Sequence, residues 1–348
     1  MRRGLMGWDP DELPKGTLEA RIARLRSAMQ GARLDAILFY TNLTRPSAVT
    51  WLTGFTPYWS DGILLVGQAG PPVFATALSK RVASWIQSTN AVSEIVNTPK
   101  PGAAVGQRLA GSKRAGVLEL DSLPSGLYDE VTGAAPAIEL SDAGTLFAAT
   151  RRGIDDAERR LIGRADALAA AALDQIDAAN ATNAGATAGL VEKHARLNGA
   201  EEAYIAVAPN LDADRRMIRI TRSTPLAGRF AIRASVAYKG SWVRRTRSFA
   251  KDETGKRAVA RADAWLARVI GSLAPGKPVT AQVADQLKVL PGAELKNVLV
   301  ESCVGSYPLQ VIADALADGS FLVLTVALAI DGIPWLGAAP AFVGNQRR

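Results

Sequence analysis

Apolar residues in the first 150 positions alternate between helical and strand spacing. Ile22, Leu25 and Met29 recur every three or four residues and predict an amphipathic helix over residues 18–30. The apolar run LDAILFY at residues 34–40 follows directly and predicts a strand. Further strands are expected at 62–66, 73–76, 116–120 and 138–140, with a helix at 79–86. This alternation predicts an α/β N-terminal domain over residues 1–150.

A second domain is predicted over residues 151–348. Asp155 or Asp156 can cap an alanine-rich helix that runs to about residue 179. The further elements expected are helices over 187–197, 256–273 and 280–287 and strands over 204–207, 230–238, 242–249, 298–303, 321–329 and 341–343. Lys239-Gly240 is a turn signal that joins two of these strands in a hairpin. The order of elements predicts an α+β fold with an antiparallel sheet.

Composition narrows the class of protein. The 348 residues are 48% apolar and 21% charged, as in ordinary globular proteins, and suffice for two cores. The longest apolar run, 321–330, is far shorter than the roughly 20 residues of a membrane-spanning helix. Residues 1–16 lack the apolar stretch of a secretory signal, and the single cysteine, Cys303, cannot form an internal disulfide. We therefore expect a cytoplasmic protein without a membrane anchor.

Positive charge is concentrated in one segment. The net charge is +8, and residues 215–247 hold nine arginines, one lysine and no Asp or Glu. The arginines are Arg215, Arg216, Arg219, Arg222, Arg229, Arg233, Arg244, Arg245 and Arg247. Two guanidiniums about 5 Å apart repel by roughly 3 kcal/mol at an effective dielectric of about 20. The segment therefore needs carboxylate partners, of which Asp212 and Asp214 are the nearest in sequence, or a solvated face, or an anionic ligand.

The basic segment does not predict a nucleic-acid-binding protein. The chain has no basic arm, no zinc-finger spacing and no aromatic-rich RNA-binding motif. Because a guanidinium donates hydrogen bonds and does not accept them, the arginines cannot ligate a cation either.

Several strings resemble the creatinase, Xaa-Pro aminopeptidase and prolidase family. They are LDAILFY, VTWLTGF, RRGIDDAERRLIGRADALA, IAVAPN, AYKGSWVRRTRSF, LAPGKPVTAQV and DGSFLVLTV, in the family's order over about residues 15–345. The resemblance implies a creatinase-like α/β N-terminal domain followed by a pita-bread domain with a curved antiparallel sheet. It also implies a protein that dimerises.

The resemblance further implies where metal ligands would lie in active relatives. The two aspartate positions fall on Arg233 and Arg244, and the two glutamate positions fall near Thr325 and Ala338. The histidine positions fall near Ser302, Leu309 and Arg215. The only histidine, His194, is predicted to lie on a helix as a partly exposed residue. A dinuclear hydrolytic site needs several oxygen or nitrogen ligands. We therefore expect no metal, no other cofactor and no metallopeptidase activity.

The remaining candidates are non-metal site residues. In the resembling fold Arg233 and Arg244 converge on the former metal cavity, where they could bind a carboxylate or phosphate. Ser302, Tyr238, Tyr307 and Arg215 are the other candidate ligand-binding residues. Cys303 is a weak candidate nucleophile, since a lone cysteine among apolar residues is usually a buried small side chain. Glu301 is a weak candidate base that we expect to face away from the cavity.

Three hypotheses follow. In the first, a metal-free protein binds an anionic small molecule or peptide carboxylate in an arginine-lined cavity between the domains. In the second, a non-catalytic subunit, as a homodimer or paired with a related subunit, regulates a partner. In the third, the protein is a metal-independent C–N hydrolase of the creatinase type, so the sequence leaves open whether it is an enzyme.

Overall fold

The computed structural model describes residues 8–42, 47–55, 61–219, 223–304, 307–311 and 315–344, and the side chains of 303–304 and 307–311 lie outside this description. The chain divides into two compact units, whose main boundary lies between Glu158 and Arg159. The α/β arrangement predicted for the first part and the α+β arrangement predicted for the second are both confirmed.

The first unit is built on a six-stranded mixed sheet of order β4-β3-β2-β1-β5-β6. Its elements are α1 (Lys15–Gly31), β1 (Ala36–Thr41), α2 (Ser47–Thr53), β2 (Gly62–Gly67), β3 (Val73–Thr76), α3 (Ala83–Thr89), β4 (Glu94–Asn97), α4 (Pro101–Arg108), β5 (Arg114–Val117), α5 (Ser125–Ala134), β6 (Glu139–Asp142) and α6 (Gly144–Arg151), with 3₁₀ turns at Lys80–Val82 and Leu120–Ser122. The predicted strand over 116–120 ends at Val117 because Glu119 adopts a left-handed conformation, with φ of 56°.

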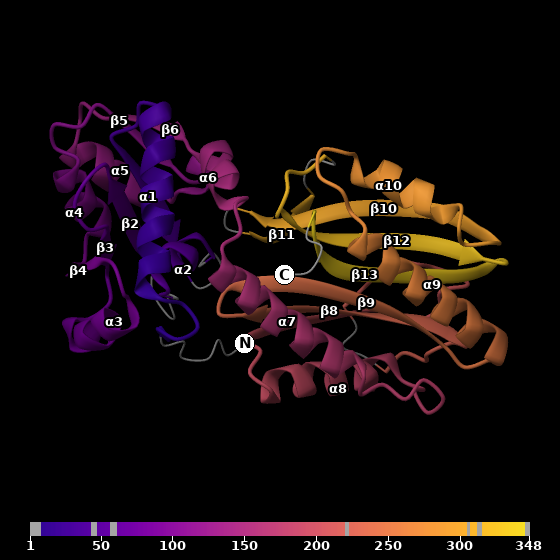
Figure 1. Cartoon of the computed structure of the whole chain (residues 1–348). Coiled ribbons are helices and arrows are strands. Elements are labelled where there is room, and N and C mark those ends of the chain that lie inside the picture. The colour runs from indigo at the N-terminus through magenta and orange to yellow at the C-terminus, as the bar shows by residue number, and fades with distance from the viewer. Residues whose placement is uncertain are drawn as a thin grey trace. The chain divides into compact units, whose positions relative to one another are not determined.

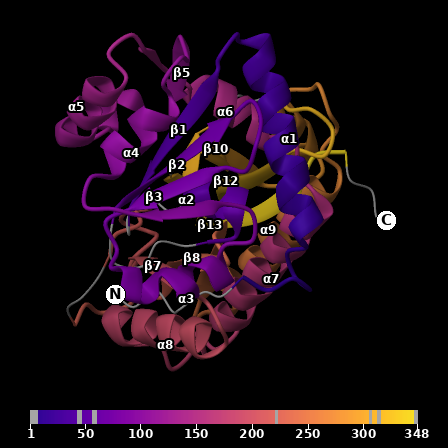
Figure 2. The same ribbon diagram turned by 90° about the vertical axis from the view of Figure 1, so that its left-hand side faces the viewer.

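Strand alternation builds one core on each face of this sheet. Ile37 and Phe39 of β1 pack in a cluster with residues of α1, α2 and α6. Ala36 and Leu38 point the other way and pack with Val105 of α4. Figure 2 shows α1 on the opposite side of β1 and β2 from α4 and α5. An unbroken apolar strand such as β1 is therefore buried on both sides.

The second unit is built on a seven-stranded sheet of order β11-β10-β12-β13-β9-β8-β7 (Figure 1). Its elements are α7 (Asp156–Leu173), α8 (Ala184–Leu197), β7 (Glu202–Ala208), β8 (Arg229–Tyr238), β9 (Ser241–Ala250), α9 (Glu253–Gly271), α10 (Val279–Leu287), β10 (Ala293–Val304), β11 (Tyr307–Val311), β12 (Phe321–Ile330) and β13 (Ile333–Phe342). Asp155 caps α7 by accepting a hydrogen bond from the Glu158 amide at 2.8 Å, as predicted.

One face of this sheet is covered by helices. Leu322, Leu324 and Val326 of β12 pack against Trp265 of α9 and Val283 of α10, and Figure 1 shows these two helices along the strands. The alternate residues of β12, which include Thr325, therefore point to the other face. No helix in the described part of the chain is long and apolar enough to cross a membrane.

Candidate functional site

The β8–β9 hairpin places Arg233 and Arg244 on the same face of the sheet. Its tip is Lys239-Gly240, with φ of 45° and 76°, the positive values that a tight two-residue hairpin turn requires. This turn fixes the register, in which Arg233 lies opposite Thr246 and Ser235 lies opposite Arg244. Because residues 233 and 235 share a face, both guanidiniums emerge on the side away from the helices.

A row of directly paired residues extends from this hairpin across the sheet. Thr246 of β9 pairs with Ala338 of β13, and Ala338 pairs with Thr325 of β12. Arg233, Thr246, Ala338 and Thr325 therefore lie side by side on one face. The sequence resemblance had indicated three of these four positions, and also Arg244 beside them, but Thr246 was missed as a site residue. We call the region that carries Arg233, Ser235, Arg244, Thr246, Glu301 and Thr325 the arginine face.

Arg244 is neutralised within the arginine face. Its Nη1 forms a salt bridge with Oε2 of Glu301, and its Nε donates to the Ser235 hydroxyl at 3.3 Å. The side chains are only 17% and 8% exposed. Glu301 does not face away from this region as expected, because it shares a strand face with Leu299, the partner of Thr325. Sequence spacing gave no sign of this pair.

Arg233 has no such partner. Within the described residues, no hydrogen bond or salt bridge joins its half-buried guanidinium to another side chain. Burial lowers the pKa of Arg233 below its usual value, the nearby Arg244 lowers it further, and Glu301 opposes both effects. A desolvated and uncompensated guanidinium favours the approach of an anion.

Two hydroxyls of the same row also lack partners. The Oγ1 atoms of Thr246 and Thr325 are buried and make no hydrogen bond within the described structure. Thr246 is only 6% exposed. A buried hydroxyl without a partner costs about 1–3 kcal/mol. An oxygen atom bound between the Thr246 hydroxyl and Arg233, which lie on paired positions, would recover part of that cost at Thr246.

Most other arginines of the basic segment have internal carboxylate partners. Arg245 binds Asp166 with two nitrogens, Arg247 binds Asp174 at 2.6 Å, and both point to the helix-covered face. Asp212 and Asp214, the partners proposed from sequence, bind Arg229 and Arg216 at 2.9 and 2.7 Å. Arg222 lies outside the described residues. The segment is therefore largely ion-paired within the described residues, whereas Arg233 and Arg215 have no carboxylate partner there.

The structure does not bring every predicted residue to the arginine face. The ring of Tyr238 lies 5.9 Å from the Arg164 guanidinium of α7, on the helix-covered side. Ser302 alternates away from Glu301, and its hydroxyl donates to the Phe321 carbonyl at 2.8 Å. Arg215 lies between β7 and β8, and its Nε has no hydrogen bond within the described structure. The side chains of Cys303 and Tyr307 lie outside the described residues. His194 lies on α8, half-buried.

The residues of the arginine face do not fit a divalent cation. They are two guanidiniums, three hydroxyls and one carboxylate, and that carboxylate is bound to Arg244. Such a cation needs several carboxylate, carbonyl or imidazole ligands. In the described part of the chain, no group of three or more His, Cys, Asp or Glu could hold a metal ion. The donor set matches an anion instead.

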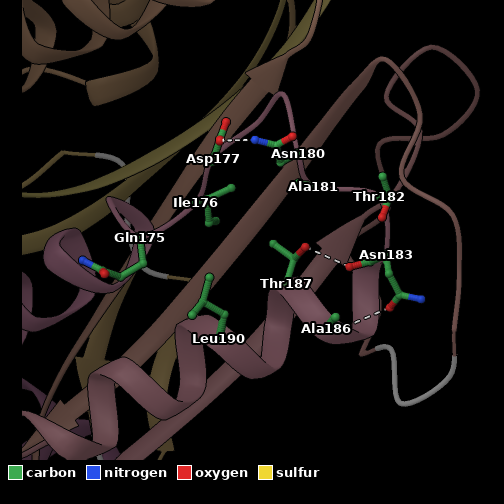
Figure 3. A pocket seen from close by; sticks show the side chains of 10 residues that line it. All are labelled: Gln175, Ile176, Asp177, Asn180, Ala181, Thr182, Asn183, Ala186, Thr187 and Leu190. Carbon is green, nitrogen blue, oxygen red and sulfur yellow. Dashed lines mark hydrogen bonds between the residues drawn. The ribbon is translucent and has the colours of Figure 1, made fainter.

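A separate pocket of about 280 Å³ lies between the end of α7 and the start of α8 (Figure 3). Its polar groups bind one another: Asp177 accepts from Asn180 at 2.6 Å, the Asn183 side chain accepts from the Ala186 amide, and the Thr187 hydroxyl donates to the Asn183 carbonyl. These local bonds stabilise the loop and leave no polar group among them directed at a ligand.

Comparison with known proteins assigns the fold. Residues 21–152 match the Creatinase/Prolidase N-terminal domain family. The Xaa-Pro dipeptidase from Bacillus anthracis is 18% identical with a TM-score of 0.72, over 94% of this chain and 95% of that one. The prolidase from Pyrococcus horikoshii OT3 is 15% identical with a TM-score of 0.68, over 93% and 95%. No curated protein matches the sequence.

A further similar structure is not named as an enzyme. It is the N-terminal domain of the FACT complex subunit SPT16 from chickpea, Cicer arietinum. It is 15% identical with a TM-score of 0.62, over 94% of each chain. At such identities the similarity establishes the architecture alone.

Proposed function

The chain has a creatinase/prolidase-like pita-bread fold, and on this premise we propose that it binds an anionic small molecule or peptide carboxylate, without metal, on the arginine face. The single observation that carries the proposal is Arg233, a half-buried guanidinium that no described carboxylate neutralises. A planar guanidinium binds a carboxylate with two parallel hydrogen bonds.

The rest of the row supports a carboxylate ligand. Thr246 lies opposite Arg233 and offers a buried hydroxyl, while Ala338 beside it presents only a methyl group. A carboxylate bound by Arg233 would therefore meet a hydroxyl donor at one side and a small apolar surface beyond it. The same residues offer no ligand set for a metal-activated water, so we propose no metallopeptidase reaction.

Calorimetry tests the proposal, with N-acetylglycine as a peptide-like carboxylate and inorganic phosphate as a second anion. We expect Arg233→Gln to weaken binding by about tenfold to a hundredfold, since hydrogen bonds to charged groups contribute about 1.5–3 kcal/mol. Arg216→Gln is the matched control, because it removes the same charge from a side chain that is 85% exposed. The proposal would be overturned if the wild type, Arg233→Gln and Arg216→Gln bound the anions with equal affinity, or if the purified protein held a stoichiometric metal.

A second candidate is a non-catalytic subunit that regulates a partner. Its support is the similarity to the SPT16 domain, which is named as part of a complex. Native mass spectrometry of the protein isolated from its host would reveal a stoichiometric partner. A protein recovered only as itself would count against this candidate.

A further inference from the structure

The arginine face carries an unequal number of opposite charges. Of the six residues that define the arginine face, Arg233 and Arg244 are cations and Glu301 is the one anion. Glu301 is bound to Arg244, whose Nε is also used by Ser235. These six residues therefore carry one uncompensated positive charge, at Arg233.

A bound anion would sit close to a carboxylate as well as to a guanidinium. Arg244 and Glu301 both interact electrostatically with Arg233. A ligand that carries one negative charge is matched by Arg233. A second negative charge would meet the Glu301 carboxylate and an Arg244 whose positive charge is already balanced by Glu301, and an unfavourable like-charge contact opposes binding.

We propose that Glu301 is a specificity-determining residue that selects monocarboxylates over dianions on the arginine face. This inference rests on the proposed function, since it concerns which anion Arg233 accepts. The remainder of the ligand is neutral: beyond Arg233 the row continues through the Thr246 hydroxyl, the Ala338 methyl and the Thr325 hydroxyl. These groups match a neutral amide or hydroxyl next to the carboxylate. N-acetylated amino acids have this chemistry.

A charge cycle tests the inference with N-acetylglycine as the monoanion and succinate as the dianion, each titrated by calorimetry. The wild type should bind N-acetylglycine more tightly. Glu301→Gln leaves two uncompensated cations and should shift the affinity ratio toward succinate by about tenfold or more. Arg244→Gln leaves no net charge and should weaken both anions, succinate the more.

The Arg244→Gln/Glu301→Gln double variant is the matched control. It restores the single charge of the wild type and should restore the preference for N-acetylglycine. Circular dichroism and thermal melting show which variants are folded. If Glu301→Gln does not fold, Arg244→Gln still tests whether the preference between the two anions follows the net charge. The role of Glu301 would be overturned if the wild type preferred succinate, or if the ratio of the two affinities did not follow the net charge of the arginine face across the variants. Anion binding itself would remain intact in either case. Absence of binding by both anions in the wild type would instead refute the proposed function.

Discussion

Arg244 and Glu301 form a salt bridge that crosses two intervening strands. They are 57 residues apart in sequence, and β13 and β12 lie between their strands in the sheet. Three strand spacings amount to about 14 Å, so the two side chains lean toward each other above Val323, the register partner of Glu301. The ion pair therefore ties the two halves of the sheet together on the arginine face.

Breaking this ion pair should destabilise the protein. Glu301→Gln or Arg244→Gln leaves the other charge unpaired in a poorly exposed position, and each should lower the free energy of unfolding by about 3 kcal/mol. The double variant should lose less than the sum of the two. Urea unfolding of the wild type, the two single variants and the double variant measures the coupling energy between Arg244 and Glu301. Lys256→Ala, in an exposed pair with Glu253, should show no measurable change, and additive effects at Arg244 and Glu301 would contradict the pairing.

Glu201 should make stability fall as pH rises. Its carboxylate accepts hydrogen bonds from the Lys239 and Gly240 amides at the hairpin tip. Burial raises the pKa of Glu201 from 4.5 to about 7, although these bonds oppose the shift. The folded state thus holds the proton more tightly than the unfolded state does. The stabilising contribution is complete below about pH 4.5 and is lost as pH approaches about 7.

Glu201→Gln should remove this part of the pH dependence. The wild type should lose about 3 kcal/mol more than the variant between pH 4.5 and 7, as an order of magnitude. Chemical unfolding at half-unit pH steps measures both curves. Asp214→Asn, at an exposed residue bound to Arg216, is the control for a general charge effect. Parallel curves for wild type and Glu201→Gln would show that Glu201 titrates normally.

Two glycines should respond to alanine with opposite signs. A Cβ at Gly106 in α4 would lie 2.7 Å from both the Ala134 Cβ and the Val131 carbonyl of α5. Because the Val131 carbonyl belongs to the backbone and cannot move aside as a flexible side chain can, Gly106→Ala should destabilise the protein by about 1–3 kcal/mol. Gly163, inside α7, has nothing within 4 Å of its Cβ position. Gly163→Ala should stabilise by about 0.5–1 kcal/mol, and thermal unfolding that shows the same sign for both would contradict the close helix contact.

Local pattern predicted more of the fold than of the site. Periodicity located most of the strands, although β4 and β11 were not predicted and β13 was predicted only at 341–343. The Lys239-Gly240 turn fixed Arg233 and Arg244 on one face, because hairpin geometry is local. The pairing of Arg244 with Glu301 could not be predicted, since their strands are far apart in sequence and are placed in one sheet, with two other strands between them, only by folding. The predicted end of α7 at residue 179 was wrong for a local reason: Asp177 binds the Ala179 amide and Asn180, which competes with the helix.

Trp51 should stabilise the first unit through both its ring and its indole N–H. Its indole N–H donates to Glu158 at 2.8 Å, and both residues are 4% exposed. The guanidiniums of Arg21 and Arg24 lie 5.0 and 5.3 Å from its ring. Trp51→Phe keeps a ring for the cations but removes the donor, and should cost about 1–3 kcal/mol. Trp51→Leu also removes the cation–π contacts and should cost at least about 0.5–1 kcal/mol more. Guanidinium chloride unfolding distinguishes the two losses. Equal stability of the Phe and Leu variants would show that packing volume, and not the ring, holds the arginines.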